Sequence, residues 1–214
     1  MPQIPGSTIA NLSNPCNPVV APVAPPETTA PLTQTVTLIS ANSAWRFRDD
    51  GIDQGTAWRG AAFDDSDWGS GDAELGYGDG DEATVVGFGG DPNGKFITTW
   101  FRRAFTITNP ASVLTLTLGL VRDDGAVVYL NDAEIFRSNM PAGTITHATL
   151  AGGNTGAESA WHTTPVTPSL LVNGPNVLAV EVHQVGPTSS DISFNASLSA
   201  ILPLRRAFVP LVTR

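Results

Sequence analysis

The sequence VRDDGAVVYLND, residues 121–132, contains two adjacent aspartates and a glycine, Asp123, Asp124 and Gly125, between apolar residues. Two carboxylates can act as an acid–base pair, supply ligands to a cation, or form a turn. Adjacent residues on a strand point to opposite faces, so this pair is badly placed for two converging carboxylates. Aspartate followed by glycine suits a turn, because aspartate bonds its own backbone and glycine accepts positive φ. We therefore favour a turn, with a cation or ligand contact at the end of the domain as the alternative.

A second acidic segment, GYGDGDE at residues 76–82, is a candidate metal site. Asp79, Asp81 and Glu82 have the close spacing of calcium loops, in which a short flexible segment supplies hard oxygen ligands. The segment lacks the acidic residue that an EF-hand loop carries at its last position, so its likeness to that motif is partial. We consider one structural calcium ion at these residues, with a solvated acidic loop as the alternative.

Tryptophan residues are candidates for ligand binding. A pyranose ring has an apolar face and a polar rim, so sugar sites combine an aromatic platform with hydrogen-bonding side chains. Trp58, Trp100 and Trp161 fall on predicted loops or outward strand faces. Trp45 and Trp68 are predicted core residues. Exposed tryptophan also concentrates at contacts between protein chains, so a protein partner is the alternative to a sugar.

Histidine and acidic residues give little support for catalysis. His147, His162 and His183 lack the paired spacings of zinc sites, and no serine-nucleophile motif accompanies them. Glu181 and His183 share one face of a predicted strand. We favour a structural polar pair there, with a pair that contacts sugar as the alternative. The sequence therefore predicts a protein that is not an enzyme.

Charge and composition restrict the classes of partner. The chain has 214 residues and a formal net charge of −9, and Lys95 is its one lysine. Acidic chains of this kind are poor binders of nucleic acid and of anionic membranes. No stretch approaches the ~20 apolar residues of a membrane span. Low lysine with abundant Gly, Thr, Ser, Asn and Asp is typical of secreted bacterial β-proteins, so we expect a secreted or cell-surface location.

Apolar and polar residues alternate from about residue 35 onward, which is the period of strands with one buried face. In VLTLTLGLV, residues 113–121, the leucines alternate with threonine and glycine. DISFNASLSAIL, residues 191–202, repeats the pattern, and we find no amphipathic helical stretch of useful length. Many short strands separated by Gly, Pro, Asn and Asp predict an all-β fold, an antiparallel β-sandwich of the jelly-roll type.

The segment 51–94 breaks this alternation and is longer than the usual connection of a compact domain. Loops of this length are typically functional or held together by their own side chains. Its aromatic residues are expected to plug one end of the sandwich: Trp58, Phe63, Trp68, Tyr77 and Phe88.

Both ends of the chain are predicted tails around a central domain of residues 35–202. Residues 1–34 are rich in proline and small residues, which favour an extended arm or linker and contain the single cysteine, Cys16. Residues 203–214 begin at a proline and combine a basic pair with the apolar sequence FVPLV. Both segments carry apolar side chains that a purely solubilising linker would avoid.

The aromatic–acidic sequence FDDSDW (63–68), followed by TTWFRRAFTI (98–107), DDGAVVYLN (123–131) and NVLAVEVHQ (176–184), resembles the galactose-binding-like β-sandwich modules of secreted bacterial proteins. The resemblance covers about residues 36–202. It implies an eight- or nine-strand jelly roll that is usually non-catalytic, serves as a carbohydrate-binding or structural module, and sometimes holds one structural calcium ion.

Two non-catalytic functions follow from these observations. The first is a self-assembling cell-surface or filament subunit that contacts copies of itself through residues 1–34 and 203–214, as in strand addition to a sheet edge. The second is a secreted carbohydrate-binding module. The apolar side chains of both tails favour the first.

Overall fold

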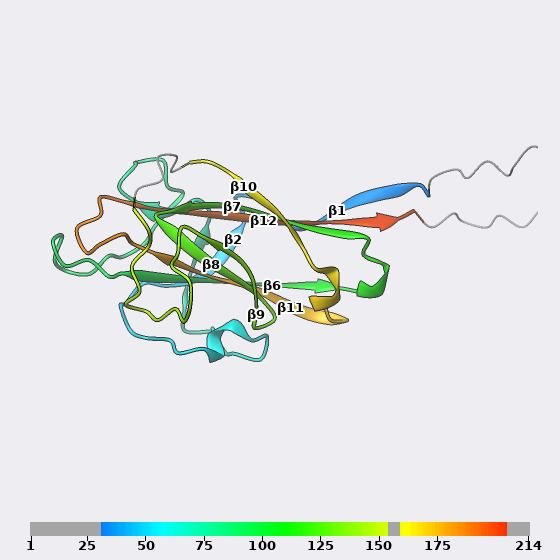
Figure 1. Ribbon diagram of the computed structural model, residues 1–214, viewed down its shortest axis with the longest axis horizontal. Coiled ribbons are helices and arrows are strands. Elements are labelled where there is room, and N and C mark those ends of the chain that lie inside the picture. Colours follow the sequence, from blue (N-terminus) through cyan, green and yellow to red (C-terminus); the bar gives the residue numbers. More distant parts are fainter. Residues whose placement is uncertain (1–30, 154–158, 205–214) are drawn as a thin grey trace, which may run out of the picture. The chain divides into compact units, whose positions relative to one another are not determined.

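The computed structural model describes residues 31–153 and 159–204 (Figure 1). Within them the chain forms twelve strands and three short 3-10 helices, η1 (Ala57–Arg59), η2 (Pro110–Ser112) and η3 (Pro168–Leu170). None of the helices among these residues has the length and apolar character needed to cross a bilayer. Most of the predicted arm 1–34, including Cys16, and most of the predicted tail 203–214 lie outside the described residues.

The strands form two sheets, which we call sheet A and sheet B. In sheet A the order is β10 (His162–Val166), β7 (Thr115–Asp123), β12 (Ile192–Pro203), β4 (Leu75–Tyr77) and β5 (Thr84–Val85), and β1 (Thr33–Ile39) also pairs with β12. In sheet B the order is β3 (Gly69–Asp72), β2 (Ala44–Arg48), β6 (Thr98–Ile107), β11 (Gly174–His183), β8 (Gly125–Leu130) and β9 (Ala133–Ser138). All pairs are antiparallel except β4 with β5.

The chain passes repeatedly from one sheet to the other. β7 lies in sheet A and β8 in sheet B, and the connections from β9 to β10, β10 to β11 and β11 to β12 also change sheet. The two layers are visible in Figure 1, with β7, β10 and β12 in one and β6, β8 and β11 in the other. The predicted all-β sandwich of the jelly-roll type is confirmed.

The core between the sheets is built by the alternating residues that the sequence predicted to point inward. The inward residues of β7 are leucines, and those of β12 include Phe194. Phe101 of β6 stacks on Phe194 with ring centroids 4.0 Å apart, and Trp45 meets the same ring edge-on at 4.9 Å. Trp45 is therefore a core residue, as predicted.

The turn between β8 and β9 closes a hairpin in sheet B. Asn131 and Asp132 have φ angles of 51° and 75°, the left-handed region in which asparagine and aspartate are the best tolerated non-glycine residues. The Asn131 side chain donates to the Leu170 carbonyl oxygen and accepts from the Val177 amide, so this turn also anchors η3 and β11.

The long segment 51–94 does not plug one end of the sandwich as a single unit, because its aromatic residues divide between two locations. Trp58 and Trp68, with Phe63, pack on the outer face of sheet B. Tyr77 belongs to the core between the sheets, and Phe88 packs against that core. The difference arises because β3, β4 and β5 interrupt the segment and carry its later part into the sheets.

Candidate functional site

The outer face of sheet B is covered by a second apolar cluster. Residues 51–68 and 140–150 lie over this face, and the part that contains η1 is visible on the outer side of the sheet in Figure 1. The cluster joins strand residues to loop residues, and its buried members are Trp58, Trp68, Trp100, Val127, Tyr129, Ile145 and Ala179. Strands β8 and β11 are consequently buried on both faces.

Arg102 fastens the covering loop to the sheet. Its side chain is buried and bonds the Asp65 carboxylate at 2.8 Å. The guanidinium also donates to the carbonyl oxygens of Trp58, Gly60 and Phe63. Arginine suits this position because its fixed fork of donors can satisfy several loop carbonyls at once.

A pocket of about 230 Å³ remains between the covering loops and sheet B, and we call it the sheet-B pocket. Trp100 and Ile145 supply its apolar lining. Its polar side chains come from three separate segments, and they are Asp53, Thr56, Arg59, Thr144, Thr146, His147 and Glu181. An adjoining cavity of about 220 Å³ shares Trp100 and His147 with it.

Glu181 of β11 provides a buried carboxylate to this pocket. The Tyr129 hydroxyl donates to its Oε1 at 2.6 Å, and Arg59 Nη2 lies 3.4 Å from the same oxygen. Burial by itself would raise the pKa of Glu181, but the bonds from His183 and Tyr129 and the charge of Arg59 hold that pKa below its ordinary value. Glu181 is therefore an ionised acceptor at neutral pH.

Tyr129 and Arg59 form one stacked unit beside this carboxylate. The Arg59 guanidinium lies over the Tyr129 ring, 4.1 Å from its centroid, and 5.7 Å from the centroid of Trp58. Burial and the bond to Glu181 raise the pKa of Tyr129, so its hydroxyl remains a neutral donor. Stacking and the ion pair with Glu181 together set the orientation of the arginine.

His183 lies beneath the pocket rather than in it. The side chain is fully buried, and its Nδ1 is 2.8 Å from the Thr149 carbonyl oxygen and 2.9 Å from Thr98 Oγ1. Its Nε2 is 3.4 Å from Glu181 Oε2. The predicted sharing of one strand face by Glu181 and His183 is confirmed, and His183 contacts the carboxylate while Glu181 lines the cavity.

His147 and Asp53 form the outer part of the pocket. His147 Nδ1 lies 3.1 Å from an Asp53 carboxylate oxygen, and both side chains are exposed. The pocket therefore has an exposed polar entrance and a buried polar floor, with Trp100 lining the space between. Nothing in the sequence pattern distinguished Asp53, Arg59 or His147 from ordinary loop residues.

The predicted tryptophans do not converge. Trp100 lines the sheet-B pocket, and Trp58 packs edge-on against Tyr129 at 5.8 Å as a fully buried part of the adjoining cluster. Trp161 lies on sheet A, the opposite sheet, and is 46% exposed. Trp68, predicted to be in the core, is buried in the outer cluster instead.

Asp123 and Asp124 do not form a hairpin turn, because β7 and β8 belong to different sheets. They lie where the chain crosses from sheet A to sheet B, and both are buried. The Asp124 carboxylate accepts from the Val185 amide at 2.7 Å and from the Ser189 hydroxyl at 3.0 Å. Asp124 therefore holds the end of β11 and the loop after it against the crossing.

The acidic segment 76–82 is arranged differently from the predicted metal set. Oxygens of Glu74, Asp79 and Asp81 lie within 4.8 Å of one another, the one group among the described residues that could hold an ion. Glu82 instead accepts from the amides of Asp79 and Gly80, at 3.0 Å each. Burial and neighbouring acids raise the pKa values of Glu74 and Asp79. Clustered carboxylate oxygens of this kind suit a hard cation.

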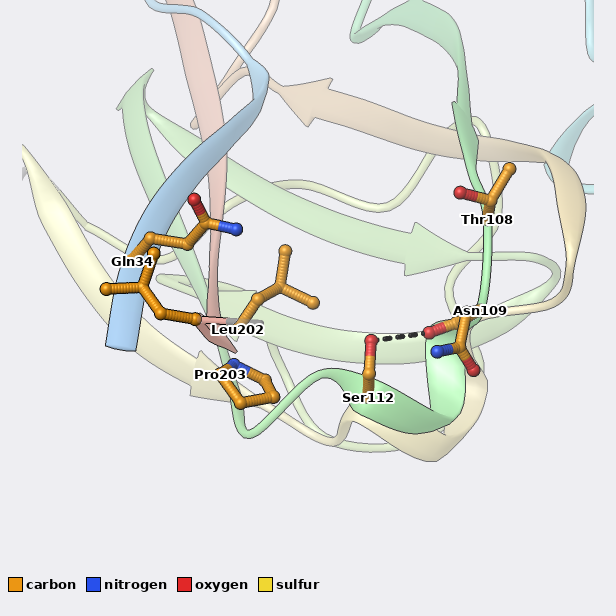
Figure 2. Close-up of a pocket in the computed structure, with 7 residues that line it drawn as sticks. Gln34, Thr108, Asn109, Ser112, Leu202 and Pro203 are labelled. Carbon is orange, nitrogen blue, oxygen red and sulfur yellow. Dashed lines mark hydrogen bonds between the residues drawn. The ribbon is translucent and has the colours of Figure 1, made fainter. Parts of the chain in front are cut away.

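A further cavity of about 550 Å³ lies where the β1–β12 ladder ends. Figure 2 shows Gln34 and Leu202 on one side of it and the η2 region on the other, where the Ser112 hydroxyl donates to the Asn109 carbonyl oxygen at 2.8 Å. Exposed apolar residues are found at this end, namely Leu32, Ile201 and Leu204. The Leu204 amide donates to the Leu32 carbonyl oxygen at 2.8 Å, so the two described chain ends lie together.

Comparison with known proteins identifies the fold. No protein-family model matches the chain, and a search of curated proteins finds no match. Among solved structures, a Bacteroides uniformis beta-glucuronidase is 22% identical with a TM-score of 0.50, over 79% of this chain and 18% of its own. A calcium-binding mutant of Bacteroides uniformis beta-glucuronidase 2 gives the same values. A beta-glucuronidase from glycoside hydrolase family 2 is 17% identical with a TM-score of 0.50, over 80% of this chain and 18% of its own.

The chain thus spans less than a fifth of the length of these solved structures. At such identities the likeness establishes the fold, a β-sandwich of the galactose-binding-like kind, as the sequence resemblance implied.

Proposed function

We propose that this protein is a non-catalytic carbohydrate-binding domain that holds a sugar unit in the sheet-B pocket and acts outside the cell. The observation that carries the proposal is the ionised Glu181 carboxylate in a pocket that Trp100 and Arg59 also line. The fold likeness to portions of beta-glucuronidases supports the same class of function. The proposal takes the second sequence-based hypothesis over the first.

The composition of the pocket suits a sugar better than an apolar ligand. Glu181 accepts hydrogen bonds, Arg59 donates them, and three threonines can do both. Trp100 is buried and supplies apolar atoms to the wall of the pocket, against which the apolar part of a sugar can pack. Because Glu181 and Arg59 already contact each other at 3.4 Å, the site is preorganised before ligand arrives.

The same groups argue against glycoside hydrolysis. A general acid for that reaction needs a carboxyl group whose pKa is raised, whereas the pKa of Glu181 is lowered. The second carboxylate at the pocket, Asp53, is exposed and pairs with His147. We therefore expect the pocket to bind a neutral polyol without hydrolysing it.

The proposal is tested with a glycan array and titration calorimetry on the full chain. The wild type is expected to bind a neutral mono- or disaccharide, and Glu181→Gln is expected to weaken binding about tenfold or more, because a charged acceptor is lost. Glu134→Gln, which disturbs an exposed ion pair on β9, is the matched control and should bind normally. Absence of any sugar ligand, or normal binding by a folded Glu181→Gln variant, would overturn the proposal.

We also propose that the acidic group on sheet A holds one structural calcium ion, with Glu74, Asp79 and Asp81 as ligands. Their oxygens are close together, and besides burial the charges of Asp81 and Asp79 raise the pKa of Glu74, a repulsion that a divalent cation would relieve. Calcium is expected to raise the melting temperature relative to EDTA, by stabilising the folded state alone. Glu74→Gln should abolish this shift and Glu82→Gln should preserve it; the reverse result would favour the set predicted from sequence.

Assembly through residues 1–34 and 203–214 is a second candidate function. It is favoured by the three exposed apolar residues where the described chain ends meet, Leu32, Ile201 and Leu204. Light scattering on the full chain is expected to give a multimer, and Leu32→Glu with Leu204→Glu a monomer. A monomeric wild type at working concentration would remove this candidate.

A further inference from the structure

The outer face of sheet A is open where residues 197–203 of β12 and their neighbours on β1, β7 and β10 form it, and this part is rich in hydroxyl groups. Across its strands the register aligns Thr37 of β1 with Ser199 of β12, Ser199 with Thr117 of β7, and Thr117 with Pro165 of β10. The next row aligns Ser197 with Gly119 and Gly119 with Thr163. These outward side chains are partly or fully exposed. We call this surface the sheet-A face.

The sheet-A face is uncharged. From Ser197 to the end of β12, and at the outward positions of β1, β7 and β10 beside it, the described side chains include no acid and no base. The chain as a whole carries a formal charge of −9. In the described part of the chain the acidic residues lie away from this face and gather elsewhere, including the Glu74 group farther along sheet A.

Trp161 lies on this face as a supported aromatic platform. A Cβ atom added to Gly119 would lie 3.1 Å from the Trp161 ring and 2.7 Å from Ser197 Oγ, so the indole rests on bare backbone. The rest of the side chain is open to solvent, at 46% exposure. Glycine at this position of β7 is what allows the ring to approach the sheet so closely.

We propose that the sheet-A face binds an extended, uncharged polysaccharide, with Trp161 stacking on one sugar ring and the serine and threonine hydroxyls bonding to its neighbours. The inference deepens the proposed carbohydrate-binding function and rests on it, but it concerns a separate surface. Outward hydroxyls recur every ~4.8 Å across the strands and every ~6.7 Å along them. A polymer with repeated hydroxyl groups and apolar ring faces can meet such a surface at several points along its length.

Charge and composition favour this occupant over others. A polyanion would meet the negative field of the protein, and a polycation would find no carboxylate among the described residues of the face. A second copy of the chain is less well matched, because homodimer interfaces have apolar centres. This face instead carries mostly hydroxyl groups, and its apolar residues Trp161, Pro165 and Ile201 are interspersed among them. Each sugar of a flexible neutral polymer is expected to bind weakly. On an extended face several sugars of one polymer bind together, which raises the overall affinity.

The test uses the full chain in sedimentation assays with microcrystalline cellulose, chitin and curdlan, and with carboxymethylated cellulose as the charged counterpart. The wild type is expected to bind at least one neutral polymer, and to bind carboxymethylated cellulose less than cellulose. Trp161→Ala, and separately Thr117→Glu with Ser199→Glu, should lower the partition coefficient about tenfold, because stacking is lost or charge is introduced. Glu181→Gln should sediment like the wild type.

The outcomes distinguish polymer binding by the sheet-A face from sugar binding in the sheet-B pocket. Loss of soluble-sugar binding by Glu181→Gln with retained polymer binding supports two sites. A wild type that sediments with none of the three neutral polymers, or folded sheet-A face variants that sediment normally, overturns the inference without touching the sheet-B pocket. If light scattering finds a wild-type dimer that Thr117→Glu with Ser199→Glu converts to a monomer, the face is a contact between copies and the inference is also overturned.

Discussion

The outer faces of sheet A and sheet B both follow from the alternation of apolar and polar residues along the strands. The two faces differ in the size and charge of their outward side chains and in whether loops cover them. On sheet B the outward residues of β6 and β11 include Trp100, Arg102 and Glu181, and loops cover them. On sheet A the part of the outer face nearest β1 carries short hydroxyl residues on β7 and β12 that are at least partly exposed, namely Thr115, Thr117, Ser197 and Ser199. Farther along the same strands the outward residues are buried, including Val121, Ser193 and Asn195. Large aromatic and charged side chains provide contacts that hold a loop, whereas short hydroxyl side chains provide few.

This difference explains why the enclosed pocket lies on sheet B. A covering loop leaves gaps wherever its backbone departs from the sheet, and buried polar groups such as Glu181 and Arg102 must find partners inside it. An open face encloses no cavity. A ligand that binds there has to be extended, so that it contacts the face at many points.

The largest expected effect comes from placing the same charge at the centre of each outer face. Ala179 of β11 is fully buried beneath the covering loop, so Ala179→Glu is expected to lower the free energy of unfolding by about 5 kcal/mol or to prevent folding. Thr117→Glu on β7 should change it by less than about 1 kcal/mol. Urea denaturation measures both, and similar losses in the two variants would contradict the contrast between the faces.

A smaller effect is expected at the fastening of the covering loop. Arg102→Met should cost about 3 kcal/mol, because three loop carbonyls and Asp65 lose their donor. Arg46 lies directly opposite Arg102 on β2, is exposed, and donates one long hydrogen bond to the loop, to the Trp68 carbonyl oxygen at 3.3 Å. Arg46→Met is therefore the matched control for a weak fastening, with a loss of about 0.5 kcal/mol. Equal losses would mean that the loop is held by its aromatic residues alone.

The two tyrosines compare the core with the covered face of sheet B, because Tyr77 lies between the sheets and Tyr129 lies beneath the covering loops. Burial and the charges of Asp191 and Asp124 raise the pKa of Tyr77 to about 12, and burial with Glu181 raises the pKa of Tyr129. Folded protein should therefore develop little tyrosinate absorbance at pH 10, and Tyr129→Phe should leave one titration near pH 12. Because both folded pKa values exceed the unfolded value, the associated stability is full below about pH 10 and is lost as pH rises through the folded pKa. A tyrosinate midpoint at pH 10 in Tyr77→Phe would show that the loop leaves Tyr129 accessible.

The smallest expected effect concerns tryptophan fluorescence. Four of the five tryptophans are at most 4% exposed, and Trp161 is 46% exposed. Trp161→Phe should therefore remove most of the fluorescence that acrylamide quenches, with little change in stability. Trp68→Phe, which alters a buried ring on sheet B, should leave the quenchable fraction unchanged. Strong quenching that survives Trp161→Phe would show that sheet B is more open than its packing indicates.

Strand periodicity gave a correct account of the fold, because a one-sided apolar stripe has to point into a core. The leucines of β7 and the core position of Trp45 were predictable in this way. Periodicity also grouped Glu181 with His183. It could not tell which outward faces a loop would cover, since that depends on contacts between residues far apart in sequence, such as Arg102 with Asp65.

The details of the sites were predictable only in part for the same reason. Trp100 was a candidate and lines the pocket, but Asp53, Arg59 and His147 reach it from two loops that the sequence does not connect. The acidic segment 76–82 was recognised, yet Glu74 lies just outside it and takes the position expected of Glu82. Asp123 and Asp124 looked like a turn because a crossing between sheets needs the same local bend.

The ladder of β1 with β12 has a mechanical consequence. Thr33 pairs with Pro203, so the described sandwich starts and finishes at the same point, on two antiparallel strands. Tension applied through both ends would break the hydrogen bonds between these strands one after another, starting at Thr33 and Pro203. Tension between one end and a ligand bound on a sheet would load many hydrogen bonds at the same time. The domain would thus withstand pulling far better when held by a single end than when stretched between both ends.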